Sequence, residues 1–173
     1  EYTLILEDDV NLELSYLWDF KLSELAKNFE DPDFDIIKLF NIYFFNGIKE
    51  DGSFTVTRES YDWPTWSCVA NIYSRKGLKA TIDKLLQEDG TVVIPPSYSK
   101  ELRNVSDKIF YKDVQAYNIN PPLCLINIGK YQLTTRMIGS YDKGYLHANR
   151  LLNMYEGKYL KEKPKGFLAR FFN

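Results

Sequence analysis

A short apolar run that ends in three acidic side chains is the feature that most constrains the fold of this chain. Residues 4–6 are Leu-Ile-Leu, and Glu7, Asp8 and Asp9 follow them directly. So short a run of large aliphatic residues, ended by charge, predicts a buried β-strand of an α/β protein. Open α/β sheets bind their ligands at the carboxyl ends of strands, so we expect the three carboxylates at a ligand-binding edge.

The three carboxylates have two interpretations. Adjacent carboxylates repel one another unless a cation or strong hydrogen-bond donors lie among them. Hard oxygen ligands suit Mg²⁺ or Mn²⁺, and an ion held in this way can also bind a phosphate. Alternatively, the acids cap a following helix and interact favourably with its dipole. The spacing by itself leaves both interpretations open.

Strand-like and helix-like patterns alternate along the rest of the chain. Strands are predicted at residues 35–40, 43–45, 54–57, 68–73, 114–119 and 123–128, with a hairpin turn at 50–53. Helices are predicted at 13–29, ended by Asp-Pro-Asp at 31–33, at 75–86, capped by Ser74, and at 145–155. This alternation predicts an α/β protein with a mixed sheet flanked by helices.

Composition limits the class of protein. With 173 residues, 45% of them hydrophobic, the chain is long enough for one domain with a real core. The net charge of −2 gives no support to nucleic-acid binding. Cys68 and Cys124 lie in apolar runs, so reduced core residues are expected, with a disulfide as the alternative. No run is long enough to cross a bilayer, and no signal peptide is visible.

The last eighteen residues differ from the rest of the chain. Residues 156–173 carry five basic against two acidic side chains, interleaved with phenylalanines. A basic, aromatic end can lie on an anionic membrane surface, although docking of its aromatic side chains on the core is the simpler alternative. We therefore predict a main domain at 1–155 and a separate tail at 156–173. The expected location is the cytoplasm or the periphery of a membrane.

Four segments, in this order, resemble a known family. They are residues 4–10 (Leu-Ile-Leu-Glu-Asp-Asp-Val), 35–39 (Asp-Ile-Ile-Lys-Leu), 70–79 (Ala-Asn-Ile-Tyr-Ser-Arg-Lys-Gly-Leu-Lys), and 106–110 with 114–122. Together they resemble glycosyltransferase family 25, which includes bacterial lipooligosaccharide galactosyltransferases and relatives of collagen galactosyltransferase. The resemblance implies a GT-A-like mixed sheet. The chain departs from the family at Asn71, where Ala-Tyr is typical, and lacks the family's N-terminal strands ahead of Glu1, so a partial fold is expected.

The resemblance also implies a chemistry for the acidic residues. The donor would be a nucleoside diphosphate sugar, most simply UDP-galactose, with Mn²⁺ or Mg²⁺ neutralising the diphosphate leaving group. Asp9 is the first candidate for metal ligation, and Asp8 the second. Glu7 or Asp8 would reach the ribose or a metal-bound water. Family members usually invert the anomeric centre, which needs a general base on the acceptor hydroxyl, and Asp107 is the candidate. Alternatively, Asp107 stabilises the start of a helix at Ser106.

Other candidate residues follow from residue type and position. His147, the single histidine, is a candidate metal ligand or a surface residue of a helix. Arg136 is a candidate phosphate contact. Tyr61, Trp63 and Trp66 form an aromatic group that either stacks on an acceptor sugar or packs in the core.

Three functions are consistent with this sequence. The first is a metal-dependent hexosyltransferase that moves a galactosyl group to a glycan or protein acceptor. The second is a non-catalytic carbohydrate-binding or scaffold module derived from such an enzyme. The third is another carboxylate–metal enzyme such as a phosphodiesterase, which is disfavoured because those enzymes draw on several histidines and this chain has one.

Overall fold

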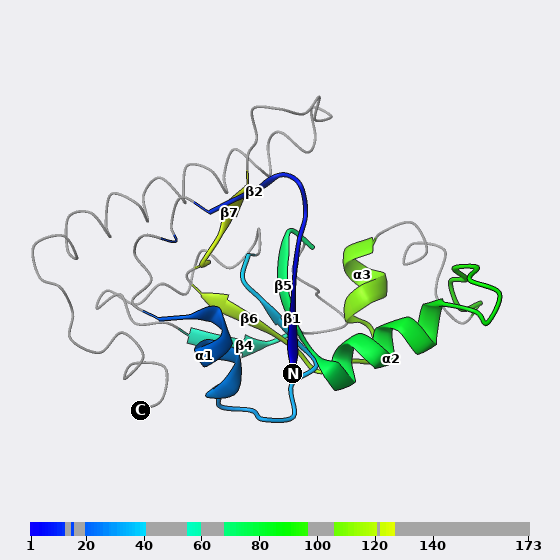
Figure 1. Ribbon diagram of the computed structural model, residues 1–173, viewed down its shortest axis with the longest axis horizontal. Coiled ribbons are helices and arrows are strands. Elements are labelled where there is room, and N and C mark those ends of the chain that lie inside the picture. Colours follow the sequence, from blue (N-terminus) through cyan, green and yellow to red (C-terminus); the bar gives the residue numbers. More distant parts are fainter. Residues whose placement is uncertain are drawn as a thin grey trace, which may run out of the picture.

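The chain folds as a mixture of short strands and helices, as the computed structural model shows (Figure 1). The structure describes residues 1–12, 15, 20–40, 55–59, 68–96, 106–120 and 122–126. The helices are α1 (Leu22–Lys27), α2 (Arg75–Leu85) and α3 (Ser106–Tyr111). The strands are β1 (Tyr2–Leu6), β2 (Val10–Asn11), β3 (Ile36–Lys38), β4 (Thr55–Arg58), β5 (Ala70–Ser74), β6 (Ala116–Asn120) and β7 (Leu125–Ile126). The predicted α/β class is confirmed.

Five of these strands form one mixed sheet in the order β1-β5-β3-β6-β4. β1 and β3 both pair with β5 in the antiparallel direction, and β3 pairs with β6 in parallel, so β1, β3 and β6 run the same way. Their carboxyl ends therefore lie at one edge, the carboxyl edge, and their amino ends lie at the opposite amino edge. β4 is antiparallel to β6. The small sheet of β2 and β7 lies beyond the carboxyl edge (Figure 1).

Different helices cover the two faces of the sheet. Neighbouring residues of a strand point to opposite faces, so Ile36 and Ile37 of β3 belong to different clusters. The larger cluster joins α1 to the strands through buried residues: Leu25, Ala26, Ile37, Ile72 and Ile119. The smaller cluster joins α2 and α3 to the opposite face: Leu78, Tyr111, Ile36, Tyr73 and Ala116. The central strands are thus fixed by apolar burial on both sides.

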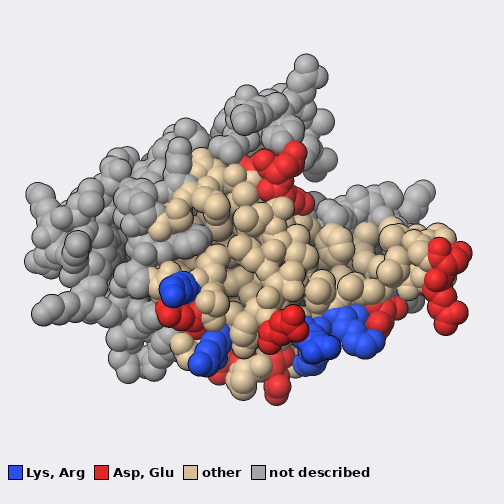
Figure 2. Space-filling model, viewed as in Figure 1, with Lys and Arg blue, Asp and Glu red and all other residues tan. Residues whose placement is uncertain are grey.

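Charged side chains are unevenly distributed over the described surface (Figure 2). Figure 2 shows acidic side chains at the carboxyl end of β1 and basic ones over the start of α2. The basic residues there are Arg75, Lys76 and Lys79, all of them exposed.

The junction between β5 and α2 depends on a serine and a glycine. Ser74 caps the helix, because its Oγ accepts a hydrogen bond from the Gly77 amide at 3.0 Å. The Ser74 amide donates to the Asp35 carbonyl at 3.0 Å, which brings the helix start onto β3. A Cβ on Gly77 would lie 2.2 Å from the same carbonyl oxygen. Only glycine fits this contact without a shift of the backbone.

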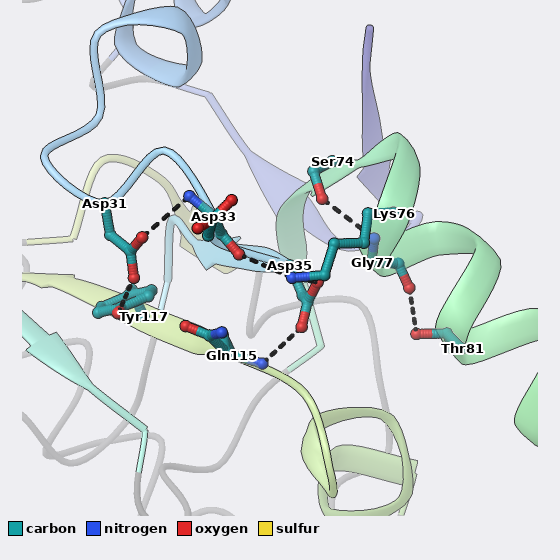
Figure 3. A network of polar contacts seen from close by, with 9 residues as sticks. All are labelled: Asp31, Asp33, Asp35, Ser74, Lys76, Gly77, Thr81, Gln115 and Tyr117. Atoms are coloured by element: carbon teal, nitrogen blue, oxygen red, sulfur yellow. Dashed lines mark hydrogen bonds and ion pairs between the residues drawn. The ribbon is translucent and has the colours of Figure 1, made fainter.

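Buried and half-buried carboxylates at the amino edge have partners (Figure 3). Asp35, which is buried, accepts a hydrogen bond from the Gln115 amide at 2.8 Å through Oδ2, while its Oδ1 lies 3.4 Å from the Lys76 ammonium. Lys76 also donates to the Asp33 carbonyl at 3.2 Å. These contacts join the starts of β3, β6 and α2 into one amino-edge network.

Asp31 extends the amino-edge network to β6. Its carboxylate accepts hydrogen bonds from the Tyr117 hydroxyl and, at 2.9 Å, from the Asp33 amide. The bond from Tyr117, followed by that from Asp33, lowers the pKa of Asp31. The carboxylate is therefore held in its ionised form by donors that the fold supplies.

β1 is an exposed edge strand, so the prediction that it is buried was wrong. All five of its residues are exposed, and Leu4 retains 44% of its accessible surface. The reason is topological: β1 is the last strand of the sheet and pairs with β5 alone among the described strands. A short aliphatic run therefore identified a strand correctly but did not indicate its place in the sheet.

The helix predicted for residues 13–29 is also wrong in extent. α1 begins after Lys21, whose backbone is extended with φ −91° and ψ 141°, and ends at Asn28. The Lys21 amide donates to the Glu24 side chain at 3.2 Å, so the helix starts there instead of continuing through Phe20. Residues 13, 14 and 16–19 lie outside the described residues.

Most other element predictions are confirmed. β3, β5, β6, α2 and the helix start at Ser106 lie where the sequence placed them, and β7 lies within predicted strand 123–128. β4 confirms the strand predicted at 54–57, but its partner is β6. The other half of the predicted hairpin, 43–45, lies outside the described residues.

Both cysteines are buried and free, which confirms the expectation of reduced core residues and excludes the disulfide. Burial raises the pKa of the Cys124 thiol to about 12.

Within the described ranges, no helix has the length and apolar character needed to span a bilayer. The predicted helix at 145–155 and the tail at 156–173 lie outside them. The division at residue 155 and the membrane contact of the tail remain predictions.

Candidate functional site

The acidic triplet Glu7-Asp8-Asp9 forms a turn at the carboxyl end of β1. The Glu7 amide donates to the Val69 carbonyl at 2.8 Å, which extends the pairing of β1 with β5 by one residue. The Val10 amide donates to the Glu7 carbonyl at 3.3 Å and closes the turn over Asp8 and Asp9. Val10 then begins β2, whose pairing with β7 holds the far side of the turn. The backbone of the triplet is thus fixed at both ends.

This geometry bears on the helix-capping interpretation of the triplet. The residues that follow it directly form β2 rather than a helix. The helix-capping interpretation is therefore wrong. The expected position of the acids at the carboxyl end of a strand is confirmed, because β1 ends at Leu6.

Asp9 differs from its two neighbours. Glu7 and Asp8 are exposed, whereas Asp9 is half-buried. Its Oδ1 is shielded from solvent and accepts no hydrogen bond within the described part of the chain. Burial raises the pKa of Asp9, a hydrogen bond with its own backbone lowers it by less, and the nearby charge of Asp8 raises it further. The ionised carboxylate is therefore incompletely compensated by the protein groups around it.

A hard divalent cation is the ligand that this arrangement suits. Asp9 Oδ1 is shielded and accepts no hydrogen bond among the described residues, and two further carboxylates lie beside it in the chain. Together they offer oxygen ligands and negative charge, which suit a cation and not an anion. Mg²⁺ and Mn²⁺ commonly use one or two protein carboxylates and complete their coordination with water and phosphate oxygens. Among the described residues, no three His, Cys, Asp or Glu side chains already converge on one point. Asp9, with Asp8 or Glu7, would thus hold the ion together with groups from a ligand.

The remaining predicted site residues are only partly placed. Asp107 is the second residue of α3, which confirms the helix but leaves its roles as base and as helix-stabilising acid both open, since its side chain lies outside the described part. The other candidates lie outside the described residues altogether: Tyr61, Trp63, Trp66, Arg136 and His147. The structure therefore brings together Glu7, Asp8 and Asp9, and the other assignments stay predictions.

A row of buried polar side chains next to the carboxyl edge was missed by the sequence interpretation. Asn71, Lys38 and Asn118 are neighbours across β5, β3 and β6, and each is at most 2% exposed. The signal was present, because each interrupts an apolar strand with a polar residue at a position that alternation assigns to the interior. A buried polar group needs a partner, so polar interruptions of this kind in an amino-acid sequence indicate a network of hydrogen bonds.

No family model, curated protein or solved structure matches this chain.

Proposed function

We propose that this chain is a metal-dependent hexosyltransferase of GT-A type that transfers a sugar, most simply galactose from UDP-galactose, to a glycan or protein acceptor. The observation that carries the proposal is the shielded, unbonded Oδ1 of Asp9 within three adjacent carboxylates. A carboxylate in this state favours binding of a cation, and a cation at a strand end can hold a diphosphate.

The sheet supports the proposal at the level of architecture. β1, β3 and β6 direct their carboxyl ends to the same edge, with the reversed strand β5 between the first two. This is a mixed sheet with helices on both faces, the architecture that the resemblance to family 25 implies. The acidic triplet lies at the edge where such sheets bind ligands.

In this proposal the roles of the acidic triplet follow from its position at the end of β1, and the roles of the other residues follow from the resemblance to family 25 and from residue type. Bound Mn²⁺ or Mg²⁺ would supply Lewis-acid stabilisation of the diphosphate leaving group. Asp9 would hold the ion, and the exposed Glu7 and Asp8 would contact the ribose or ordered water. Asp107 would accept the proton of the acceptor hydroxyl, and Arg136 and His147 would contact the phosphates and the metal. The aromatic side chains of residues 61–66 would bind the acceptor.

Calorimetry with Mn²⁺ and UDP tests the proposal. We expect the wild-type chain to bind the pair and Asp9→Ala to abolish binding, because the variant lacks the shielded carboxylate. Asp83→Asn is the matched control, since it removes an exposed carboxylate from α2 and should leave binding unchanged. Equal binding by Asp9→Ala and the wild type would refute the metal assignment.

The same experiment separates the proposal from a carbohydrate-binding or scaffold function. The exposure of Glu7, Asp8 and the whole of β1 favours this alternative, since a transfer site normally excludes water. A wild-type chain that binds an immobilised glycan but neither Mn²⁺ nor UDP would establish the alternative in place of the transferase.

A further inference from the structure

β1 is an edge strand, and one of its two sides is open. Among the described strands it pairs with β5 alone, in a continuous register from Tyr2 to Leu6. Natural proteins usually protect such a strand with a lysine, a proline or a bulge, because its unpaired backbone groups can bond to another strand. Residues 2–6, Tyr-Thr-Leu-Ile-Leu, include no charged residue, proline or glycine. β1 therefore lacks the usual protection against pairing with a further strand.

The hydrogen bonds at the two ends of β1 define which backbone groups face its open side. The Arg75 amide donates to the Glu1 carbonyl at 3.2 Å, and the Glu7 amide donates to the Val69 carbonyl at 2.8 Å. In an antiparallel pair, the residues that bond to the partner strand alternate with residues that do not. Residues 1, 3, 5 and 7 thus bond to β5, and the amides and carbonyls of residues 2, 4 and 6 point away from the sheet.

The side chains of these three outward-bonding residues form an apolar row. Leu4 pairs with Ile72 of the larger cluster, and the Tyr2 ring stacks on Phe34 of that cluster with 5.7 Å between ring centres. The row therefore lies on the face of the sheet that α1 covers. Tyr2, Leu4 and Leu6 nevertheless retain 42%, 44% and 36% of their accessible surface. A strand added to β1 would cover this row and extend the apolar face.

The two ends of β1 carry different charges. The acidic triplet follows its carboxyl end, whereas Arg75 lies beside its amino end, 3.7 Å from the Glu1 carboxylate. Figure 1 shows β1 in front of the other strands, and Figure 2 shows, from the same side, a largely uncharged surface between the acidic side chains and the basic ones over α2. A complementary partner is apolar at its centre and presents a cation opposite the triplet. An antiparallel copy of the same strand, with its own Arg75, has this pattern.

We propose that β1 is the contact surface of a homodimer, in which β1 of a second copy pairs with it in the antiparallel direction about a two-fold axis at Leu4. A two-fold interface must be self-complementary, and two identical antiparallel strands meet this condition. In this register Leu4 lies opposite Leu4 of the second copy, and Tyr2 lies opposite Leu6, so all three outward-bonding residues find partners. The two sheets then form one continuous sheet. This pairing does not depend on the proposed transfer reaction.

The same register gives Arg75 a specific role in the dimer. It places Glu1 opposite Glu7 of the second copy, and two carboxylates in opposite positions repel each other. Arg75 lies beside Glu1, and both side chains are mostly exposed, so its guanidinium would pair with a carboxylate from each copy. The two-fold axis repeats this contact at the other end of the strand pair.

Two substitutions at Leu4 test the contact. The Leu4 amide faces the open side, so Leu4→Pro removes a donor from that side and leaves the bonds to β5 in place. If Leu4→Pro fails to fold, Leu4→Lys tests the same position with the charge that natural edge strands use. We expect the wild-type chain to sediment as a dimer and both variants to sediment as monomers. The matched control is Ile82→Lys, because Ile82 is also 44% exposed but lies on α2, and this variant should remain dimeric.

A charge reversal tests the proposed role of Arg75. Arg75→Glu should raise the dissociation constant of the dimer about tenfold at low salt, and high salt should weaken the wild-type dimer. The variant should keep its fold, because the first turn of α2 has no acidic residue and an acid there interacts favourably with the helix dipole. Arg75→Glu/Glu7→Arg exchanges the two charges and should restore the wild-type dissociation constant.

Amide hydrogen exchange locates the contact within β1. Exchange at residues 2, 4 and 6 should slow as the protein concentration rises, whereas exchange at residues 3 and 5, which bond to β5, should not change. This pattern, together with loss of the dimer in the Leu4 variants alone, would support the proposal. A wild-type chain that is monomeric at about 100 μM would overturn it. A dimer that survives in both Leu4 variants, or protection that does not follow the alternation, would overturn it as well.

Discussion

At the amino edge of the sheet, the buried Asp35 accepts a backbone hydrogen bond from Gln115 through Oδ2, and its Oδ1, which accepts no hydrogen bond among the described residues, lies 3.4 Å from the Lys76 ammonium. At the carboxyl edge, Asp9 is shielded from solvent with an oxygen that accepts no hydrogen bond in the described part of the chain. The two carboxylates have the same chemistry and lie on the same sheet, so the difference lies in what the fold supplies to each. The ammonium of Lys76 compensates the charge of Asp35, whereas Asp9, which has no such cation among the described residues, costs stability and is available to a ligand.

The same comparison extends to the backbone around each carboxylate. The amino edge brings β3, β6 and α2 together through a capped helix start and a glycine that touches Asp35. The carboxyl edge ends in a turn that is held on both sides, with the Glu7 and Asp8 side chains exposed. Mutations at the amino edge should therefore change stability, and mutations at the carboxyl edge should change ligand binding.

The largest expected effect is that of Gly77→Ala at the amino edge. The new Cβ would lie 2.2 Å from the Asp35 carbonyl oxygen. Because this is a backbone atom, the clash can be relieved only by moving the backbone of α2 or of Asp35. We expect a loss of about 3 kcal/mol in the free energy of unfolding, measured by urea denaturation.

Gly90→Ala is the control for this glycine. Gly90 has a φ of +83° but open space around its Cβ position, so alanine there meets only backbone strain of about 1 kcal/mol. Equal losses for the two variants would show that the contact with Asp35 is not what demands glycine at residue 77.

The second prediction compares the two carboxylates directly. Asp35→Ala removes the acceptor of the Gln115 amide and the partner of Lys76, and should cost about 2 kcal/mol of unfolding free energy. Asp9→Asn should cost nothing or stabilise the metal-free protein, because it removes a poorly compensated charge. A loss for Asp9→Asn as large as that for Asp35→Ala would remove the distinction between the edges.

The pH dependence of the Asp9 effect has a defined sign. The pKa of Asp9 is raised in the folded state above its ordinary value of 3.8, so folding disfavours the ionised form. The wild type should therefore gain stability relative to Asp9→Asn as pH falls through the raised pKa toward the ordinary value. Urea denaturation of both proteins at about pH 7 and about pH 4 measures the difference in their free energies of unfolding. We expect the advantage of Asp9→Asn to be smaller at the lower pH, and a larger advantage there would contradict the prediction.

The third prediction concerns the helix cap at the amino edge. Ser74→Ala removes the hydroxyl that accepts the Gly77 amide and should cost about 1 kcal/mol. Ser74→Asp should recover most of the loss, because its carboxylate can accept the same bond and interacts favourably with the helix dipole. Thermal unfolding followed by circular dichroism measures both. An equal loss in the two variants would indicate that side-chain packing, not capping, is what Ser74 contributes.

Local signals in the sequence were sufficient for two features of the amino edge, the helix cap and the buried strand, but not for its network of contacts between distant residues. Ser74 directly precedes an amphipathic pattern, and the capped helix α2 begins where that pattern starts. The aliphatic run of β3 predicted a buried strand, and its three residues are buried. Such features depend on neighbours in the chain, so the sequence displays them.

The carboxyl edge required information that the sequence does not display locally. The run before Glu7 predicted a buried strand, but burial depends on strand order, which is set by pairings between distant segments. The state of Asp9 depends on the turn and on the pairing of β2 with β7. Glu59, which pairs with Lys38, lies 21 residues away in the chain. The acidic triplet could thus be found from sequence, and its electrostatic state could not.

The smallest expected effect lies away from both edges, on the exposed surface of α2. Lys79 and Asp83 form an ion pair at the i, i+4 spacing, and both side chains are mostly exposed. Asp83→Asn should cost about 0.3 kcal/mol at low salt and less at high salt, because water and ions screen exposed charges. Urea denaturation at two salt concentrations measures this value. This small value is the reference for the two edges. Asp9, Asp35 and Asp83 are all aspartates of the same protein, and they differ in how deeply they are buried and in which donors and cations lie near them. If Asp83→Asn lost as much unfolding free energy as Asp35→Ala, the stabilising effect of Asp35 would come from its pairing with a lysine. Its burial and its hydrogen bond from a backbone amide would then contribute little.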